Sequence, residues 1–474
     1  MHAAPGTVLG AASMTKKENP LRMISSIRFK NALRTAAVPL LGSAILLAPA
    51  LDVLADDAPA KSSGILPLAD YSGDFALRSY LLGDLNGNRT EWAEKGFTFN
   101  IDYNQYFQAV VDGGADTGSA YGGTIDYNFA IDFDRMGLIP GGLLQMRAVS
   151  RYGNSVNGIS GSIVPVNTDA THPTTSTFDE NVALWLPVIN YTQFLSEKFA
   201  VSFGKYDTYD SANEFAGGRG RSQWWNLNLN MPVSPALVIP YSILGTSVVV
   251  MPAPNMSITG MVATSTDTSN STGLDDLDDG LFGLLQITNQ YQISDLPGGF
   301  GLMYGYGWNG SFNEINGRIN IDEGQLIPST KDNTWFVSAD FWQYLWVEGD
   351  AAQAVDTTNG RQDLQGVGVF FRVQFADPDT NPLDYSISAG VNARGLVPGR
   401  DNDTMGIAYS YNKLRKGRFL NALGIADSSS VWEFFYNIEL TPAVHLTLDA
   451  QVVDSPFPDI DTATILGTSM QIRF

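Results

Sequence analysis

Apolar and polar residues alternate with a period of two along much of the chain after residue 96. From Phe97 to Phe107, aromatic and branched apolar residues occupy one set of alternate positions, with Gln105 as an exception. Thr, Asn and Asp occupy most of the other set, and the same pattern returns at 432–440 and 444–452. Because successive side chains of a strand point to opposite faces, the pattern predicts strands with one apolar and one polar face.

These predicted strands are long, and their polar faces are strongly polar. Each has about 10 residues, the length that a tilted strand needs to cross the hydrocarbon layer. Strands of soluble proteins average only about 5–6 residues. A soluble β-sandwich or propeller also alternates and is the alternative. The length, and the Asp, Glu, Arg and Asn on the polar face, favour an all-β transmembrane antiparallel barrel with a wet lumen.

The pattern predicts sixteen strands, and single-chain bacterial barrels have an even number. The expected strands are 97–110, 123–133, 143–152, 181–192, 199–207, 246–251, 256–264, 281–293, 300–310, 333–345, 366–376, 383–393, 404–412, 430–440, 444–453 and 462–474. Short connections should be periplasmic turns, and long polar connections should be extracellular loops. The register is least secure between 346 and 403, because 346–365 is long where a turn is due and 377–382 is short where a loop is due.

The end of the chain and the strand count together indicate a closed pore. Phe474 ends an alternating last strand and resembles the outer-membrane assembly signal. The last strand must pair with the first, because an open sheet would expose unpaired backbone groups to lipid. Sixteen strands leave an aqueous channel, whereas side chains fill the interior of an eight-stranded barrel. The architecture therefore predicts a porin.

The first 55 residues have the parts of a secretory signal peptide. A basic stretch from Lys16 to Arg34 precedes an apolar segment at 35–50, and Ala55 precedes an acidic pair. A cytosolic amphipathic helix is the alternative. We therefore expect a signal peptide at 1–55, an N-terminal periplasmic extension at 56–96 and the barrel at 97–474. No later stretch reaches 18 uninterrupted apolar residues, which excludes a helical inner-membrane protein.

Composition excludes several further classes. The chain has 474 residues, of which 16% are charged, and its net charge is −21. That acidity argues against nucleic acid as a partner. With no Cys and three scattered His, we expect no metal centre, thiol catalysis or cofactor, and no catalytic triad or phosphate loop stands out. The acidic loop at 275–280 lacks the spacing of a specific Ca²⁺ site, and a solvated loop bridged by cations to lipopolysaccharide suits it better.

Several motifs resemble the carbohydrate-selective porin (OprB) family, from about residue 80 to the end. The stretches that carry the resemblance are Leu82-Gly83-Asp84, Tyr121-Gly122-Gly123, Ser150-Arg151-Tyr152-Gly153, Phe215-Ala216-Gly217-Gly218, Asp379-Thr380-Asn381-Pro382 and Gly395-Leu396-Val397-Pro398-Gly399-Arg400. The resemblance implies passive diffusion of glucose and other small sugars through a narrowed, partly cationic pore in the outer membrane of a Gram-negative bacterium.

The loop from 208 to 245 is the expected inward-folded constriction loop, because general porins fold a loop into the lumen at this place. It supplies donors and flat rings suited to sugar hydroxyls and C–H faces: Arg219, Arg221, Trp224 and Trp225. Two alternatives stay open. The arginines can pair with lumen acids instead, and the tryptophans can pack the loop against the wall.

Strand periodicity adds candidates from the barrel wall. Arg147 and Arg151 share the polar face of their strand and should point inward. Further candidates for lumen charge are Lys205, Asp340, Arg372, Glu433 and Glu439. The expected partners are small sugars, outer-membrane lipid, lipopolysaccharide and the outer-membrane assembly machinery.

The rival functions are a general cation-preferring porin and a barrel-borne enzyme or adhesin. Removal of 1–55 takes away a net charge of +4 and leaves about −25, which suits a cation channel. An enzyme would need a catalytic His with Ser and an acid, and an adhesin would need a large inserted domain; neither is visible. The oligomeric state stays open, with a homotrimer, common among sixteen-stranded porins, as one alternative.

Overall fold

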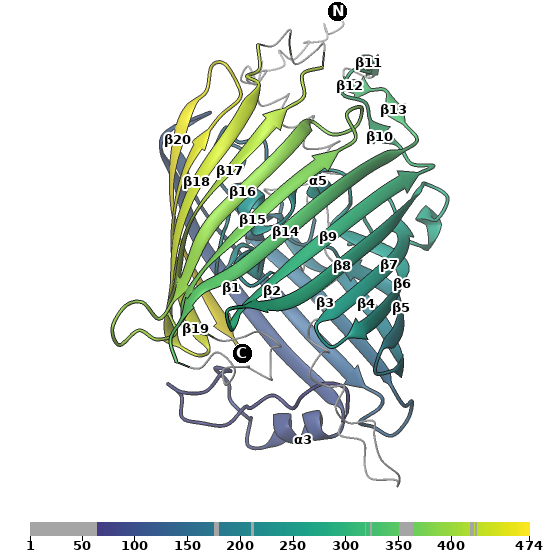
Figure 1. Cartoon of the computed structure of the whole chain (residues 1–474), viewed down its shortest axis with the longest axis vertical. Helices are drawn as coiled ribbons and strands as arrows, with labels where there is room; N and C mark the ends of the chain where they lie inside the picture. The colour runs from purple at the N-terminus through teal and green to yellow at the C-terminus, as the bar shows by residue number, and fades with distance from the viewer. Residues whose placement is uncertain are drawn as a thin grey trace, which may run out of the picture.

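The computed structural model describes residues 64–174, 180–209, 213–317, 319–322, 325–349, 364–417, 421 and 424–474. Its main body is a closed antiparallel barrel of sixteen strands, in which each strand pairs with the next and the last pairs with the first (Figure 1). The predicted fold class is therefore confirmed. The expected signal peptide at 1–55 lies outside the described residues.

The barrel strands, in order around the wall, are β1 Phe97–Gly114, β2 Gly118–Asp132, β3 Gly142–Gly153, β4 Val182–Ser196, β5 Phe199–Asp207, β6 Ser242–Ala253, β7 Met256–Thr264, β8 Leu281–Ile293, β9 Leu296–Trp308, β14 Thr334–Val347, β15 Gly366–Ala376, β16 Leu383–Arg394, β17 Thr404–Leu414, β18 Ser428–Thr441, β19 Val444–Asp454 and β20 Asp461–Arg473. Two small two-stranded sheets lie in the β9–β14 connection: β10 Phe312–Asn313 pairs with β13 Thr330–Lys331, and between them in the chain β11 Ile319–Asp322 pairs with β12 Gln325–Pro328.

Helices are few and short in the described residues. The α-helices are α3 Asn88–Glu94, α4 Leu227–Asn230 and α5 Val233–Ala236, and the 3₁₀ turns are η2 Asp169–Thr171, η3 Gly218–Gly220 and η4 Leu274–Asp276. Within the described part of the chain, we find no helix with the length and apolarity to span a membrane.

Each predicted strand corresponds to an observed one, with differences confined to the ends. The largest is at β2, which begins five residues before its predicted start, and β6 and β9 each begin four residues before theirs. For β9, Pro297, Gly298 and Gly299 suggested a longer turn, but the turn consists of Ser294 and Asp295, which both have positive φ. Two residues of positive φ form the turn that best matches the twist of a hairpin, so strand pairing resumes at Leu296.

The two faces of the wall follow the period-two pattern. Large apolar side chains such as Phe203 and Trp432 are 58% and 52% exposed and point outward. Their neighbours Ser202 and Glu433 are buried on the lumen side. In lipid the outward set contacts hydrocarbon, so the alternation is a division between lipid and lumen.

Connection lengths, not strand order, cause the irregularity noted between 346 and 403. The end of β14 and the start of β15 lie at the same end of the barrel as the short turns and the C-terminus (Figure 1). The short connection between β15 and β16 lies at the other end, among the long loops. We call these the turn end and the loop end. Strand direction therefore alternates without a break.

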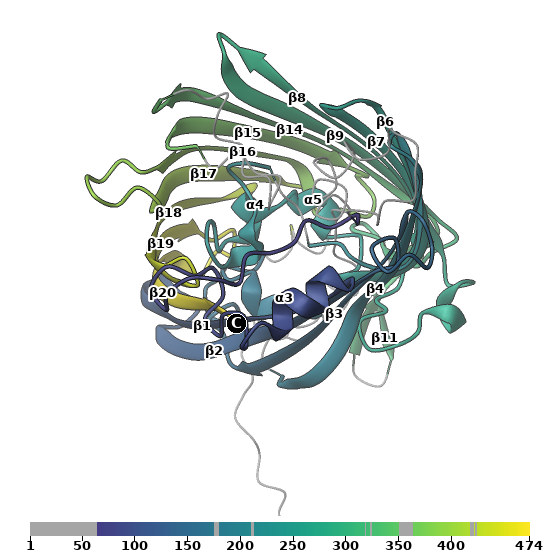
Figure 2. The ribbon, with the colours of Figure 1, turned by 90° about the horizontal axis from the view of Figure 1, so that it is seen from below.

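Two connections from the loop end fold into the lumen, and the expected loop is one of them. The β5–β6 connection carries α4 and α5, which lie inside the ring of strands (Figure 2). The β3–β4 connection also enters, because Val166 and Asp169 are fully buried and the backbone carbonyl of Val166 accepts a hydrogen bond from Gln451 at 2.9 Å. The inward fold of the β5–β6 loop was predicted from the sequence, whereas the β3–β4 connection was predicted only as a long polar loop.

The described part of the expected N-terminal extension, residues 64–96, packs across the turn end (Figures 1 and 2). Asp132 accepts hydrogen bonds from the backbone N–H groups of Ile65 and Leu66 at 2.7 and 3.0 Å. The N–H of Leu81 donates to the carbonyl of Arg473 at 2.7 Å. This N-terminal segment, as we call residues 64–96, therefore covers part of the barrel mouth.

Candidate pore constriction

The β5–β6 loop is held in the lumen by polar side chains of the wall. Glu433 of β18 accepts hydrogen bonds from the backbone N–H groups of Trp225 and Asn226 at 2.5 and 3.1 Å. On the opposite side of the loop, the N–H of Ser234 donates to Gln374 of β15 at 2.7 Å. A buried loop needs partners for its backbone groups, and the polar face of the barrel supplies them.

Trp224 and Trp225 fix the same loop through packing. Trp224 is fully buried, and its ring meets that of Phe435 edge-on, with centroids 4.7 Å apart. Trp225 is 1% exposed. The wall makes room for both rings at glycines, because a Cβ on Gly406 or Gly467 would come within 2.7 Å of one of them. Of the two alternatives for this pair, the enclosed placement corresponds to packing of the loop against the wall.

Arg221 joins the two inward loops to the wall. Its Nε donates to Asp169 of the β3–β4 loop at 2.6 Å. Its two terminal nitrogens donate to the two carboxylate oxygens of Asp126 on β2 at 2.9 and 3.1 Å. A guanidinium can satisfy two carboxylates in this way because its five N–H donors form a planar fork. The Arg221 side chain is only 3% exposed, so it acts here as a buried clamp.

Arg219 and Arg147 form a second, more open cluster. Both donate to Oδ2 of Asp207 at the end of β5, at 2.6 and 3.0 Å. Arg219 also donates to the hydroxyl of Tyr241 at 2.7 Å. The Arg219 and Arg147 side chains are 12% and 21% exposed, whereas that of Asp207 is 1% exposed. The guanidinium groups therefore reach the water of the lumen while their acid is covered.

The other predicted lumen residues have structural partners on the inner face. Arg151 is buried and donates to three loop carbonyls, those of Ala170, Thr174 and Glu180. The remaining candidates pair as follows: Lys205 Nζ with the carbonyl of Ser271 at 2.9 Å, Arg372 with Asp340 at 2.5 Å, and Glu439 with Asn402 at 2.8 Å. Arg147, Arg219 and Arg221 lie together, and Arg151 lies beside them, because it is paired with Thr124, to which Arg221 donates at 2.8 Å.

The acids of these clusters were not among the predicted site residues. Asp126 and Asp207 lie on polar faces of predicted strands, so their inward direction could have been inferred from periodicity. Asp169 lies in a loop without periodicity, and no local signal marks it. Among the described residues no group of His, Asp and Glu is arranged to hold a metal ion, and the aspartates of the 275–280 loop lie outside the clusters above.

His172 is buried between the two loops. Its ring contacts those of Tyr209 and Tyr241, and Asp169 and Arg219 lie beside it at 3.5 and 3.4 Å. Burial lowers the pKa of His172 to about 4, and the positive charge of Arg219 adds to this. Burial alone would raise the pKa of Asp169, but Arg221 and His172 lower it to about 2. At neutral pH the histidine is therefore neutral and the aspartate charged.

Acid should loosen the inward loops in the range from about pH 6.5 to 4. A released His172 would bind a proton in this range while the packed one would not, so protonation favours release by up to about 3 kcal/mol. We expect larger and noisier single-channel currents as the pH falls through this window. H172Q should remove the dependence, and H445Q at the turn end should retain it. An unchanged pH profile in H172Q would contradict the assignment, since Asp169 titrates only between its ordinary range and about pH 2.

Comparison with known proteins gives the family. Residues 116–474 match the carbohydrate-selective porin, OprB family. The chain belongs to the OprB family. No match was found among curated proteins. The resemblance from the sequence motifs is thereby confirmed, and OprB porins are passive channels of the outer membrane of Gram-negative bacteria, not enzymes.

Solved OprB structures share the barrel fold with this family member. The high-pH structure of Pseudomonas putida OprB is 16% identical, with a TM-score of 0.70, and the match covers 85% of this chain and all of that one. The low-pH structure of the same protein is 14% identical, with a TM-score of 0.53, and covers 84% of this chain and 99% of that one. At these identities the likeness concerns the fold alone.

Proposed function

We propose that this OprB porin passes small neutral sugars, glucose among them, and that Arg147 and Arg219 are the groups that contact the passing sugar. The observation that carries the proposal is exposure: the Arg147 and Arg219 side chains are 21% and 12% exposed, whereas the carboxylate that they share, Asp207, is 1% exposed. A passing sugar can therefore approach these two side chains while the acid stays covered. Sugar hydroxyls accept hydrogen bonds from guanidinium groups, and contacts of this kind must stay weak enough to release the solute.

The same arrangement supports a pore surface that is cationic where it is accessible, although the charges of the whole cluster balance. Asp126, Asp169 and Asp207 offset Arg147, Arg219 and Arg221, so a neutral solute meets little net charge. The three acids and Arg221 are buried, and the accessible groups are Arg147 and Arg219. A cation-preferring porin remains the second candidate because of the acidic composition. Net charge spread over loops says little about the constriction, and a reversal potential in a salt gradient would reveal cation selectivity.

Liposome swelling tests the sugar preference. We expect glucose to enter faster than size-matched neutral solutes that are not sugars, and R147M and R219M to reduce this preference several-fold. R219K should restore it only in part, because lysine keeps the charge and lacks the planar fork. R415M is the matched control, since Arg415 pairs with Asp384 at the loop end of the barrel. Equal rates for all solutes in the wild-type channel would refute the proposal.

Two further expectations accompany this function. We propose that the assembly machinery binds β20 and the terminal Phe474, as the sequence resemblance implies, and that lipopolysaccharide surrounds the loop end. Residues 64–96 are the described part of the proposed periplasmic extension.

A further inference from the structure

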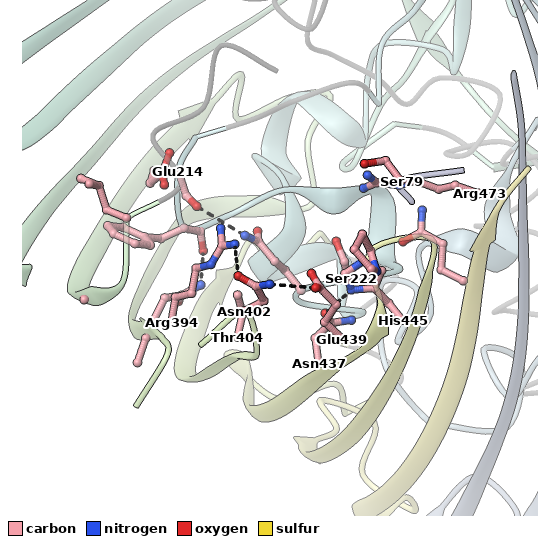
Figure 3. Close-up of a pocket in the computed structure, with 18 of the residues that line it drawn as sticks. Ser79, Glu214, Ser222, Arg394, Asn402, Thr404, Asn437, Glu439, His445 and Arg473 are labelled. Atoms are coloured by element: carbon pink, nitrogen blue, oxygen red, sulfur yellow. Dashed lines mark hydrogen bonds between the residues drawn. The ribbon is translucent and has the colours of Figure 1, made fainter. Parts of the chain in front are cut away.

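A cavity of about 450 Å³ lies on the turn-end side of the constriction (Figure 3). Glu214, Phe215, Ser222 and Gln223 of the β5–β6 loop form one side of it, and Pro67 to Asp70 with Ser79 and Tyr80 of the N-terminal segment form the other. Strands from β14 to β20 supply the wall. Its volume is within the range of sites that hold small molecules, about 300–1,000 Å³.

The wall of the cavity carries a row of groups that can both donate and accept hydrogen bonds. Asn402 accepts from Arg394 at 3.0 Å and donates to Glu439 at 2.8 Å (Figure 3). The other polar side chains of the lining include Asn392, Thr404, Asn437, His445, Gln471 and Arg473. Such a set suits a ligand with many hydroxyls, because each hydroxyl is at once a donor and an acceptor.

Aromatic rings and unpaired amide oxygens complete this lining. Tyr80, Phe215 and Tyr344 offer apolar surface to the C–H faces of a ring-shaped solute. The side-chain oxygens of Gln223 and Asn392 are buried and have no hydrogen-bond partner among the described residues. Buried polar atoms are costly unless they are paired, so a small movement that brings a solute hydroxyl to these oxygens would be favourable.

The charges around the cavity oppose one another. Asp70, Glu214 and Glu439 are acids, and Arg394 and Arg473 are bases. Neither sign dominates, so an ion gains little, whereas a neutral polyol can use both kinds of group. The chemistry of the cavity therefore matches that of the solutes proposed for the constriction.

We propose that this cavity is a second sugar subsite, which a monosaccharide occupies between the constriction and the turn-end mouth, and that the N-terminal segment forms its floor. The inference rests on the proposed function for the identity of the solute. It adds a binding step after the constriction and gives residues 67–70, 79 and 80 a direct part in transport.

Thiol protection tests the subsite, because the chain contains no cysteine. Ser79 is exposed and lines the cavity, so S79C places a single thiol there. We expect glucose to slow modification of this thiol by a methanethiosulfonate reagent several-fold in a concentration-dependent way. S72C is the matched control, because Ser72 is exposed on the same segment outside the lining. Its rate should not change with glucose, and neither rate should change with proline at equal osmolarity.

A second thiol and a variant of the cavity wall test whether the protection comes from sugar in the cavity and not from a local change near residue 79. T404C reports from the opposite wall of the cavity and should show the same protection. E439Q in the S79C background should weaken the protection, because it removes the carboxylate that accepts from Asn402. Equal modification with and without glucose at both thiols would overturn the subsite. If these same channels still admit glucose in liposome swelling, the subsite has failed and the proposed function stands.

Discussion

Replacement of Arg221 by methionine should detach the inward loops and widen the channel. In R221M the carboxylates of Asp126 and Asp169 would be buried without the guanidinium that now pairs with both. Loss of one partner from a buried ion pair costs about 3–5 kcal/mol, more than the loss of an exposed pair. Hydration of the two carboxylates would lower this free-energy cost, and water can reach them only if the β3–β4 and β5–β6 loops separate.

Single-channel conductance and liposome swelling measure this outcome. We expect a conductance increase of several-fold and faster entry of a trisaccharide than in the wild-type channel. The control is R415M, which removes an ion pair at the loop end and should leave both quantities unchanged. Addition of D126N and D169N to R221M should restore much of the narrow state, because it removes the stranded charges. Unchanged conductance in R221M would show that the clamp does not hold the constriction.

Replacement of Arg89 by methionine should release the N-terminal segment from the turn end. Arg89 is 6% exposed and donates to the backbone carbonyls of Phe99 and Phe474 at 3.0 and 3.1 Å. Its guanidinium also lies over the rings of Tyr71 and Tyr80, at 4.1 and 4.9 Å from their centroids. One side chain thus joins the N-terminal segment to β1 and to the residue after β20, where the first and last strands pair and close the barrel. Together these contacts are worth on the order of 3 kcal/mol.

Limited proteolysis of the folded barrel measures the release. A loss of this size raises the detached fraction roughly 100-fold, so trypsin should cleave after Arg78 much faster in R89M than in the wild type. K95M is the control, because Lys95 pairs with Glu91 on the exposed surface of α3 and should not change the rate at Arg78. Equal cleavage in R89M and the wild type would show that the segment is held by other contacts. The same release should remove glucose protection at the Ser79→Cys thiol.

The strands could be predicted closely because their signal is local. Alternation along β1, β18 and β19 reports which face meets lipid and which meets water, and no distant residue is needed to read it. Turn boundaries were predicted less closely. The Pro and Gly residues at 297–299 suggested a turn, but strand pairing resumes at Leu296, directly after the positive-φ residues 294 and 295. The inward direction of Arg147 also followed from periodicity.

The partners of the loop residues could not be predicted in the same way. Arg221 meets Asp126, which is 95 residues away along the chain, and Asp169, which is 52 residues away. Sequence reasoning left open whether the arginines pair with acids and whether the tryptophans pack or remain open. Burial of Trp224 against Phe435 depends on the closing of the barrel, which brings β18 to the β5–β6 loop.

By itself, the sequence determined a sixteen-stranded outer-membrane barrel of the OprB family, its lipid-facing and lumen-facing residues and the loop with the candidate arginines. Only the tertiary structure decided that a second loop enters the lumen, that three aspartates pair with the arginines, and that the N-terminal segment covers the turn end. The physical reason is the distance along the chain between the residues that interact. Alternation is set by neighbouring residues, whereas buried charges and loop backbones are satisfied by groups that only the closed barrel brings within hydrogen-bond distance.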